Sequence, residues 1–184
     1  MQGLMRSLIV VVLGGVMVAC TPAPGASPTP EVSVTPSVTP TPTPQWTEED
    51  QAAIDAVQHY LDVSSRIGQN LLDLKWDEIY DVAGGQALDD TTTTWVKWYN
   101  NGCHLVGAPT FTPEIVTTGA TDGQGHRFHV TGCYDGTDAH LVDAAGKQIP
   151  NTGVVRGPAK YLVLHLQVDG SYKVIEDVQG EGTC

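Results

Sequence analysis

Six histidines are the residues of this chain that could bind a metal ion or transfer a proton. His126 and His129 lie three positions apart in a segment with strand-like alternation, so their side chains would point to opposite faces and could not share one ion without distortion. His129 and His165 could share a face of neighbouring strands, and His140 follows a turn that contains two aspartates. A zinc site could be assembled from these residues, but the pattern is more typical of partly exposed strand histidines. We therefore predict that the chain binds no metal and no cofactor.

The segment Asp135-Gly136-Thr137-Asp138 looks like a fragment of a calcium-binding loop. It lacks the alternating oxygen ligands and the distal glutamate that such a loop needs, and it predicts a hairpin turn instead. The chain also has no Gly-x-Ser-x-Gly elbow, phosphate-binding glycine loop, His-Glu-x-x-His or Cys-x-x-Cys motif. The sequence therefore predicts a protein that is not an enzyme.

Cys20 follows a segment typical of a cleaved signal peptide. Arg6 gives the segment a positive start, and the apolar stretch 8–18 is too short to cross a bilayer. Residues 17–20, Met-Val-Ala-Cys, resemble the lipobox of bacterial lipoproteins, in which the cysteine thiol receives a diacylglycerol and the chain is cut before it. The resemblance implies a signal peptide over 1–19 and a lipidated Cys20, with palmitate-type chains holding the protein on the outer face of the cell membrane. An ordinary signal peptide with a chance cysteine, or a signal anchor, is the alternative.

Residues 20–45 read as a tether between this lipid anchor and a folded domain. Eight prolines and six threonines lie between Thr21 and Gln45, which leaves too little apolar surface to offset the entropy of ordering. Repeated Thr-Pro favours extended polyproline II, so a disordered linker reaching roughly 75 Å is expected. The remaining residues, 46–184, are enough for one domain with a single core.

The formal net charge of −12 limits the partners that this domain can have. An acidic surface repels the phosphate backbone, so no nucleic acid is expected as a partner. It also repels anionic lipid head groups, so contact with the membrane is expected only through the N-terminal lipid.

Apolar periodicity divides the domain into helices followed by strands. Thr47 is the expected N-cap of the first helix, and Gly68 is expected to interrupt the chain after it. Asp169-Gly170 predicts a two-residue hairpin turn. Helices are predicted over 48–64, 70–82 and 88–100, and strands over 104–107, 112–119, 126–134, 139–142, 159–168 and 171–178. This order predicts an α+β fold with the helices on one face of a curved antiparallel sheet.

Three helices followed by a long meander resemble the cone-shaped nuclear-transport-factor-two-like superfamily. The resemblance covers roughly 47–184 and is closer to secreted lipoprotein domains of actinobacteria or their phages. The residues that carry it are Cys133-Tyr134-Asp135, Val142-Asp143, Gly146-Lys147, Arg156, Tyr161, Asp169 to Val174 and Gly182-Thr183-Cys184. One departure is the proline pair Pro109 and Pro113, which would cramp a central strand.

With Cys20 lipidated, Cys103, Cys133 and Cys184 remain, and they allow three alternative disulfides with one cysteine left over. Each of Cys133 and Cys184 lies next to a predicted strand, and the resembling lipoproteins favour this pair. Cys103 is then expected to be free and buried. The alternative is a thiol nucleophile or a bond to another molecule.

Aromatic residues of the predicted helices could line a ligand pocket, because the cone fold encloses one between helices and sheet. The alternative is that these rings simply fill the core. The candidates for the pocket lining are Tyr60, Trp76, Trp95, Tyr99 and His129. The resemblance implies that an enzyme of this fold would need an acid or base in the pocket, and the candidates are Asp81, His129 and His165.

Together, these features favour a membrane-anchored, non-enzymatic binding module at the cell surface. Its expected partner is a cell-wall component, a secreted protein or a small apolar ligand. Two alternatives are an enzyme acting on a small hydrophobic substrate and a phage or prophage lipoprotein that excludes related phages. A pocket that holds a buried acid or histidine would favour the enzyme, whereas a collapsed aromatic core would argue against it.

Overall fold

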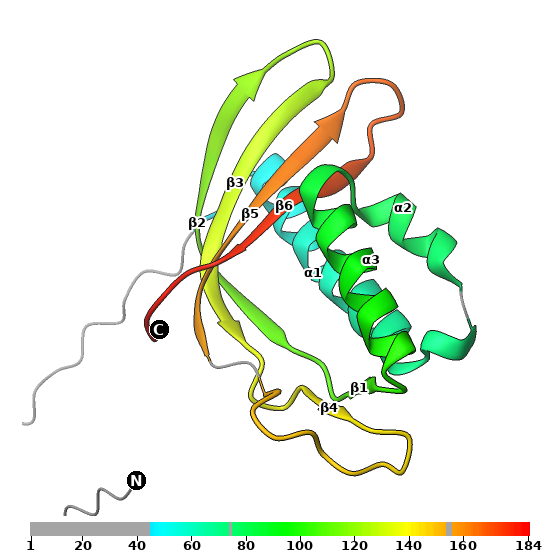
Figure 1. Ribbon diagram of the computed structural model, residues 1–184. Helices are drawn as coiled ribbons and strands as arrows, with labels where there is room; N and C mark the ends of the chain where they lie inside the picture. The colour runs from blue at the N-terminus through cyan, green and yellow to red at the C-terminus, as the bar shows by residue number, and fades with distance from the viewer. Residues whose placement is uncertain (1–44, 74, 154–155) are drawn as a thin grey trace, which may run out of the picture. The chain divides into compact units, whose positions relative to one another are not determined.

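The computed structural model describes residues 45–73, 75–153 and 156–184, which form an α+β domain (Figure 1). The predicted signal peptide, Cys20 and all but the last residue of the predicted tether lie outside the described residues. In Figure 1 the helices cover one face of a curved antiparallel sheet, which confirms the predicted fold class. Within the part of the chain that is described, none of the helices is long and apolar enough to cross a membrane.

The first helix, α1, spans Glu48–Gln69 and begins as predicted at Thr47. The Thr47 hydroxyl accepts from the Asp50 amide at 3.1 Å, and the Asp50 carboxylate accepts from the Thr47 amide at 3.1 Å, so both ends of a capping box are present. The helix continues through Gly68 instead of stopping there. A Cβ atom at position 68 would lie 3.2 Å from Cζ3 of Trp98, so glycine allows close packing rather than a break.

The predicted helix over 70–82 is wrong as a continuous element. The chain forms two short 3₁₀ turns, η1 (Leu71–Asp73) and η2 (Trp76–Glu78), and one helical turn, α2 (Ile79–Val82). Leu71 and Ile79 are buried while Leu72 is 80% exposed, so the leucines do not form one helical face. The third helix, α3 (Gly85–Asn100), begins three residues earlier than predicted and stops as expected before Gly102, whose φ is +66°.

All six predicted strands are present, and no strand end differs from its predicted position by more than two residues. They are β1 (His104–Val106), β2 (Thr110–Thr121), β3 (Gly125–Asp135), β4 (His140–Val142), β5 (Gly157–Leu166) and β6 (Tyr172–Gln179). The main sheet has the order β2-β3-β5-β6, and β1 pairs with β4 in a small separate ladder.

Pro113 is tolerated because β2 lies at the edge of the main sheet, where one side of the strand needs no partner. The register also shifts between Pro113 and Ile115. The turn at Asp169-Gly170 is longer than the predicted two residues. The Leu166 amide donates to the Ser171 carbonyl at 2.8 Å, so the residues from Gln167 to Ser171 connect β5 with β6.

The core lies between α1, α2, α3 and the helix-facing side of the sheet. Its largest fully buried side chains are Trp95, Tyr161, Phe128, Ile79, Val57, Val130, Val163 and Val174. The disulfide Cys133–Cys184 is confirmed, with a Cα–Cα distance of 5.8 Å. Among the described residues Cys103 is outside any disulfide, but it is half-buried rather than buried, because it lies in the exposed turn after α3.

Candidate ligand-binding site

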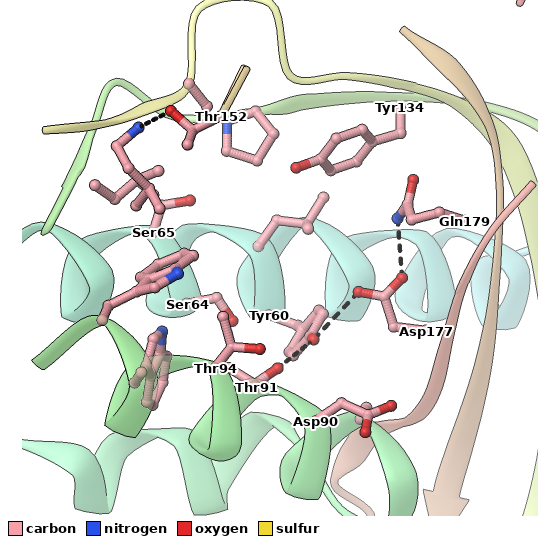
Figure 2. Close-up of a pocket in the computed structure, with 18 residues that line it drawn as sticks. Tyr60, Ser64, Ser65, Asp90, Thr91, Thr94, Tyr134, Thr152, Asp177 and Gln179 are labelled. Carbon is pink, nitrogen blue, oxygen red and sulfur yellow. Dashed lines mark hydrogen bonds between the residues drawn. The ribbon is translucent and has the colours of Figure 1, made fainter. Parts of the chain in front are cut away.

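A cavity of about 440 Å³ lies between α1, α3, the β1–β4 ladder and the end of β6 (Figure 2). This volume falls within the range of natural small-molecule sites. Most of its wall is apolar or aromatic. The lining residues are Tyr60, Leu61, Ser64, Ser65, Ala87, Asp90, Thr91, Thr94, Trp95, Trp98, Leu105, Pro109, Tyr134, Ala139, Leu141, Thr152, Asp177 and Gln179.

Asp177 is at the centre of a hydrogen-bonded cluster at one end of this cavity. Its Oδ2 accepts from the Tyr60 hydroxyl at 3.3 Å, and its Oδ1 accepts from Nε2 of Gln179 at 3.0 Å. The Tyr60 oxygen also lies 2.8 Å from Oγ1 of Thr91, so a phenol that donates to Asp177 accepts from Thr91. Figure 2 shows the carboxylate between Tyr60 and Gln179, with the side chain of Tyr134 on the opposite wall of the same cavity.

Asp177 faces the helices because β6 contains one extra residue, between Val174 and Glu176, that has no partner in β5. Val163 pairs with Val174 and Tyr161 pairs with Asp177, but the register shifts between Leu162 and Val163. Cross-strand partners share a face, so Val174 and Asp177 both face the core although they are three positions apart. Strict alternation from Val174 would turn Asp177 away from the helices. For this reason sequence reasoning missed Asp177, and no pattern in β6 singled it out, because the strand also contains Lys173, Glu176 and Gln179.

Burial raises the pKa of Asp177 above its usual range, and the nearby Asp90 carboxylate adds to the effect. The pKa of Tyr60 is also raised, first by burial and then by the charge of Asp177. The same two causes raise the pKa of Tyr134 to about 12. These phenols therefore stay protonated near neutral pH and can donate hydrogen bonds.

The cavity wall carries acidic but no basic side chains among the residues that the structure describes. The three ion pairs found in this part of the chain lie elsewhere, at Arg66–Glu78, Arg127–Asp122 and Arg156–Asp135. The hydroxyl of Ser64, one helical turn along α1 from Tyr60, is buried and has no hydrogen-bond partner in the described structure. Asp177 thus lies in a half-buried position without a compensating cation, which is an unfavourable arrangement for an ionised carboxylate.

The structure places two of the five predicted lining residues, Tyr60 and Trp95, on the cavity wall. Trp76 is not among the lining residues, and it packs against Trp95 with ring centroids 5.9 Å apart. Tyr99 is 47% exposed and does not line the cavity either. His129 lies between Phe128 and Val130, which both face the core, so its own side chain is on the opposite face of the sheet.

The predicted acid–base candidates also lie outside the cavity. Asp81 is exposed on α2, and His165 stacks on Tyr172 with ring centroids 4.2 Å apart. The Asp135 segment forms a turn in which Asp135 accepts from the amide and hydroxyl of Thr137 at 3.1 and 2.6 Å. Within the described ranges, no three histidine, cysteine or acidic side chains come close enough to hold a metal ion.

Comparison with known proteins supports the fold and nothing more specific. No protein-family model matches the chain, and no curated protein matches it. The intermembrane space region of the chloroplast protein ARC6 is similar, with a TM-score of 0.54 and 18% identity over 76% of this chain and 100% of that one. The beta subunit of benzoate 1,2-dioxygenase from Burkholderia mallei matches with a TM-score of 0.33 and 13% identity over 74% of this chain and 91% of that subunit. At these identities the similarity to the ARC6 region shows the fold alone.

Proposed function

We propose that this domain is a non-enzymatic binding module for a small, mostly apolar molecule, displayed at the cell surface by a lipid on Cys20. The observation that carries the proposal is the cavity of about 440 Å³ with one polar end. A well-packed core leaves few voids larger than a water molecule, so a space of this size lined by aromatic side chains is typical of a ligand site.

The distribution of polar groups supports this reading. Trp98 and Leu105 lie at one end of the cavity beside Gly68, whereas Tyr60 and Asp177 meet at the other. An apolar body at the first end would release water from aromatic and aliphatic surface, and the second end would fix the orientation of the ligand. The lipid on Cys20 and the tether remain predictions from the sequence, and they would place this site outside the cell membrane.

A blocking substitution tests the proposal. Thr94 lines the cavity from α3, and its neighbour Thr93 is exposed and does not, so Thr94→Phe and Thr93→Phe make the same change in and out of the site. Calorimetric titration of the full chain with naphthylethanol, a neutral aromatic probe, should show binding that Thr94→Phe abolishes and Thr93→Phe leaves intact. Equal binding by both variants, or no binding of either this alcohol or the corresponding amine by the unmodified chain, would refute the proposal.

One observation favours a second function, acid–base catalysis on a bound substrate. The pKa of the Asp177 carboxyl is raised above its usual range by burial, and this carboxyl accepts a hydrogen bond from Tyr60 inside the cavity, so it could act as a general acid or base toward a bound molecule. This function requires that a bound molecule be converted. Mass spectrometry of the probe after prolonged incubation would detect conversion, and Asp177→Asn should abolish it without abolishing binding. An unchanged probe would leave the binding module as the function.

A further inference from the structure

We propose that the molecule bound in this cavity is an organic cation, with an ammonium group at Asp177 and an apolar body directed toward Trp98 and Leu105. The inference rests on the proposed ligand-binding function and narrows it to one chemical class. It is carried by the geometry and charge of the two ends of the cavity.

The polar end offers acceptors that are not filled by the protein. Asp177 receives one hydrogen bond on each oxygen, from Tyr60 and from Gln179, whereas a carboxylate can accept about four. The Ser64 hydroxyl, which also lines the cavity, has an unused acceptor oxygen. An ammonium group has three donors and no acceptor, so it matches this end better than a hydroxyl, an amide or an acid does.

Charge favours the same class of ligand. Asp177 and Asp90 both line the cavity, and no lysine, arginine or histidine among the described residues joins them there. A half-buried carboxylate without a counter-ion destabilises the protein until a cation arrives, and the arriving cation then gains a charge-assisted hydrogen bond. An anionic ligand would be repelled by the half-buried carboxylate of Asp177 and, more weakly, by the exposed carboxylate of Asp90.

The aromatic walls of the cavity suit the apolar body of such an amine. Tyr60, Tyr134, Trp95 and Trp98 contribute aromatic rings, whose faces attract cations as well as apolar groups. Tyr60 and Gly68 are eight residues apart on α1, and Gly68 contacts the Trp98–Leu105 end, so the two ends are separated by about 12 Å along the helix. The expected ligand is therefore an amphiphilic amine with an apolar body about as long as two fused rings and a short chain.

A matched pair of probes separates this inference from the proposed function. Naphthylethylamine and naphthylethanol share one apolar body, and only the amine carries a positive charge. We expect the unmodified chain to bind the amine roughly tenfold or more tightly than the alcohol, as one hydrogen bond to a charged group would give. Asp177→Asn should weaken amine binding much more than alcohol binding, so that the preference for the amine falls from tenfold or more to less than about twofold.

Two neighbouring acids provide a graded control. Asp90→Asn should weaken amine binding by only about twofold, because Asp90 is exposed and water screens its charge. Asp89→Asn, on the same helix but outside the cavity, should have no effect. The organic-cation inference fails if the alcohol binds as tightly as the amine, or if Asp177→Asn keeps the preference for the amine. If neither probe binds, the proposed ligand-binding function fails as well. Failure of the inference alone is therefore distinguished from failure of the function by whether any probe binds.

Discussion

The Tyr60 hydroxyl on α1 donates a hydrogen bond to Asp177 on β6, across 117 positions of the chain, at an oxygen–oxygen distance of 3.3 Å. This contact joins the first helix to the last strand at the polar end of the cavity. Because Thr91 on α3 bonds to the same phenol, three elements meet at one carboxylate. The cluster therefore links the stability of the domain to the chemistry of its cavity.

The first prediction concerns the pH dependence of stability. The pKa of Asp177 is higher in the folded than in the unfolded chain, so between these two values the native state holds more protons. Stability should therefore fall as pH rises through that window, and the loss should be complete above the folded pKa. Asp177→Asn should remove this fall and leave the domain at least as stable at neutral pH, measured as the free energy of unfolding in urea from pH 4 to pH 8.

Asp169 provides a control of opposite sign. Its carboxylate accepts from the amide and the hydroxyl of Ser171 at 2.9 and 2.7 Å, and these bonds lower its pKa. Its stabilising effect is present above the unfolded pKa and is lost as pH falls through the folded pKa, so Asp169→Asn should destabilise the domain at neutral pH. If Asp177→Asn instead destabilised the domain most at neutral pH, the description of Asp177 as an uncompensated carboxylate would be wrong.

The second prediction concerns the phenol. Tyr60→Phe removes the hydrogen bonds to Asp177 and Thr91 while keeping the ring in the core, and should cost about 1 to 3 kcal/mol of unfolding free energy. Tyr99→Phe, at an exposed position on α3, should change stability by less than about 0.5 kcal/mol. Urea unfolding of both variants checks this, and equal stabilities would mean that the Tyr60 contacts contribute nothing.

The third prediction concerns the disulfide. Cys133 and Cys184 close a loop of 51 positions, so Cys184→Ser should destabilise the domain by about 4 kcal/mol in the chain-entropy model. Cys103→Ser, which affects no disulfide among the described residues, should have little effect. Thermal unfolding with and without a thiol reductant distinguishes the two variants, and a reductant that leaves the melting temperature of the unmodified protein unchanged would contradict the prediction.

The fourth prediction concerns the anchor. Cells that express the full chain with radiolabelled palmitate should incorporate label into the protein, and Cys20→Ala should abolish incorporation because the acceptor thiol is gone. Cys103→Ala serves as the control, since it removes a cysteine outside the lipobox and should leave labelling unchanged. Equal labelling of all three chains would show that Cys20 is not lipidated and would remove the basis for placing the domain at a membrane.

The strands could be predicted from the sequence because alternation, turn residues and antiparallel order agree along the meander. The helices were harder to delimit, for two reasons visible at single residues. Gly68 lies inside α1 because Trp98 packs against it, and 70–82 breaks into short turns because Leu71 and Leu72 point to different environments. In both cases tertiary contacts override local preference.

The residues of the candidate site were harder to predict from the sequence than the strands. Tyr60 and Trp95 follow from aromatic periodicity on helices, but Asp177 depends on the register shift in β6, which alternation cannot reveal. His129 was placed in the pocket from the sequence, and it lies on the opposite face because Phe128 and Val130 occupy the inner positions of β3. Asp177, the half-buried acid of the cavity, thus owes the direction of its side chain to the register shift in β6.

The bond between Cys133 and Cys184 also bears on when the site becomes competent. Cys133 precedes Tyr134 in β3, and Cys184 closely follows Gln179, so the bond fastens two segments that both reach the cavity. In a compartment that keeps thiols reduced, this fastening is missing and the end of β6 can fray. If the chain is exported and binds organic cations as proposed, oxidation would then act as a maturation step, and a newly made chain would bind such amines poorly until it had left the reducing compartment.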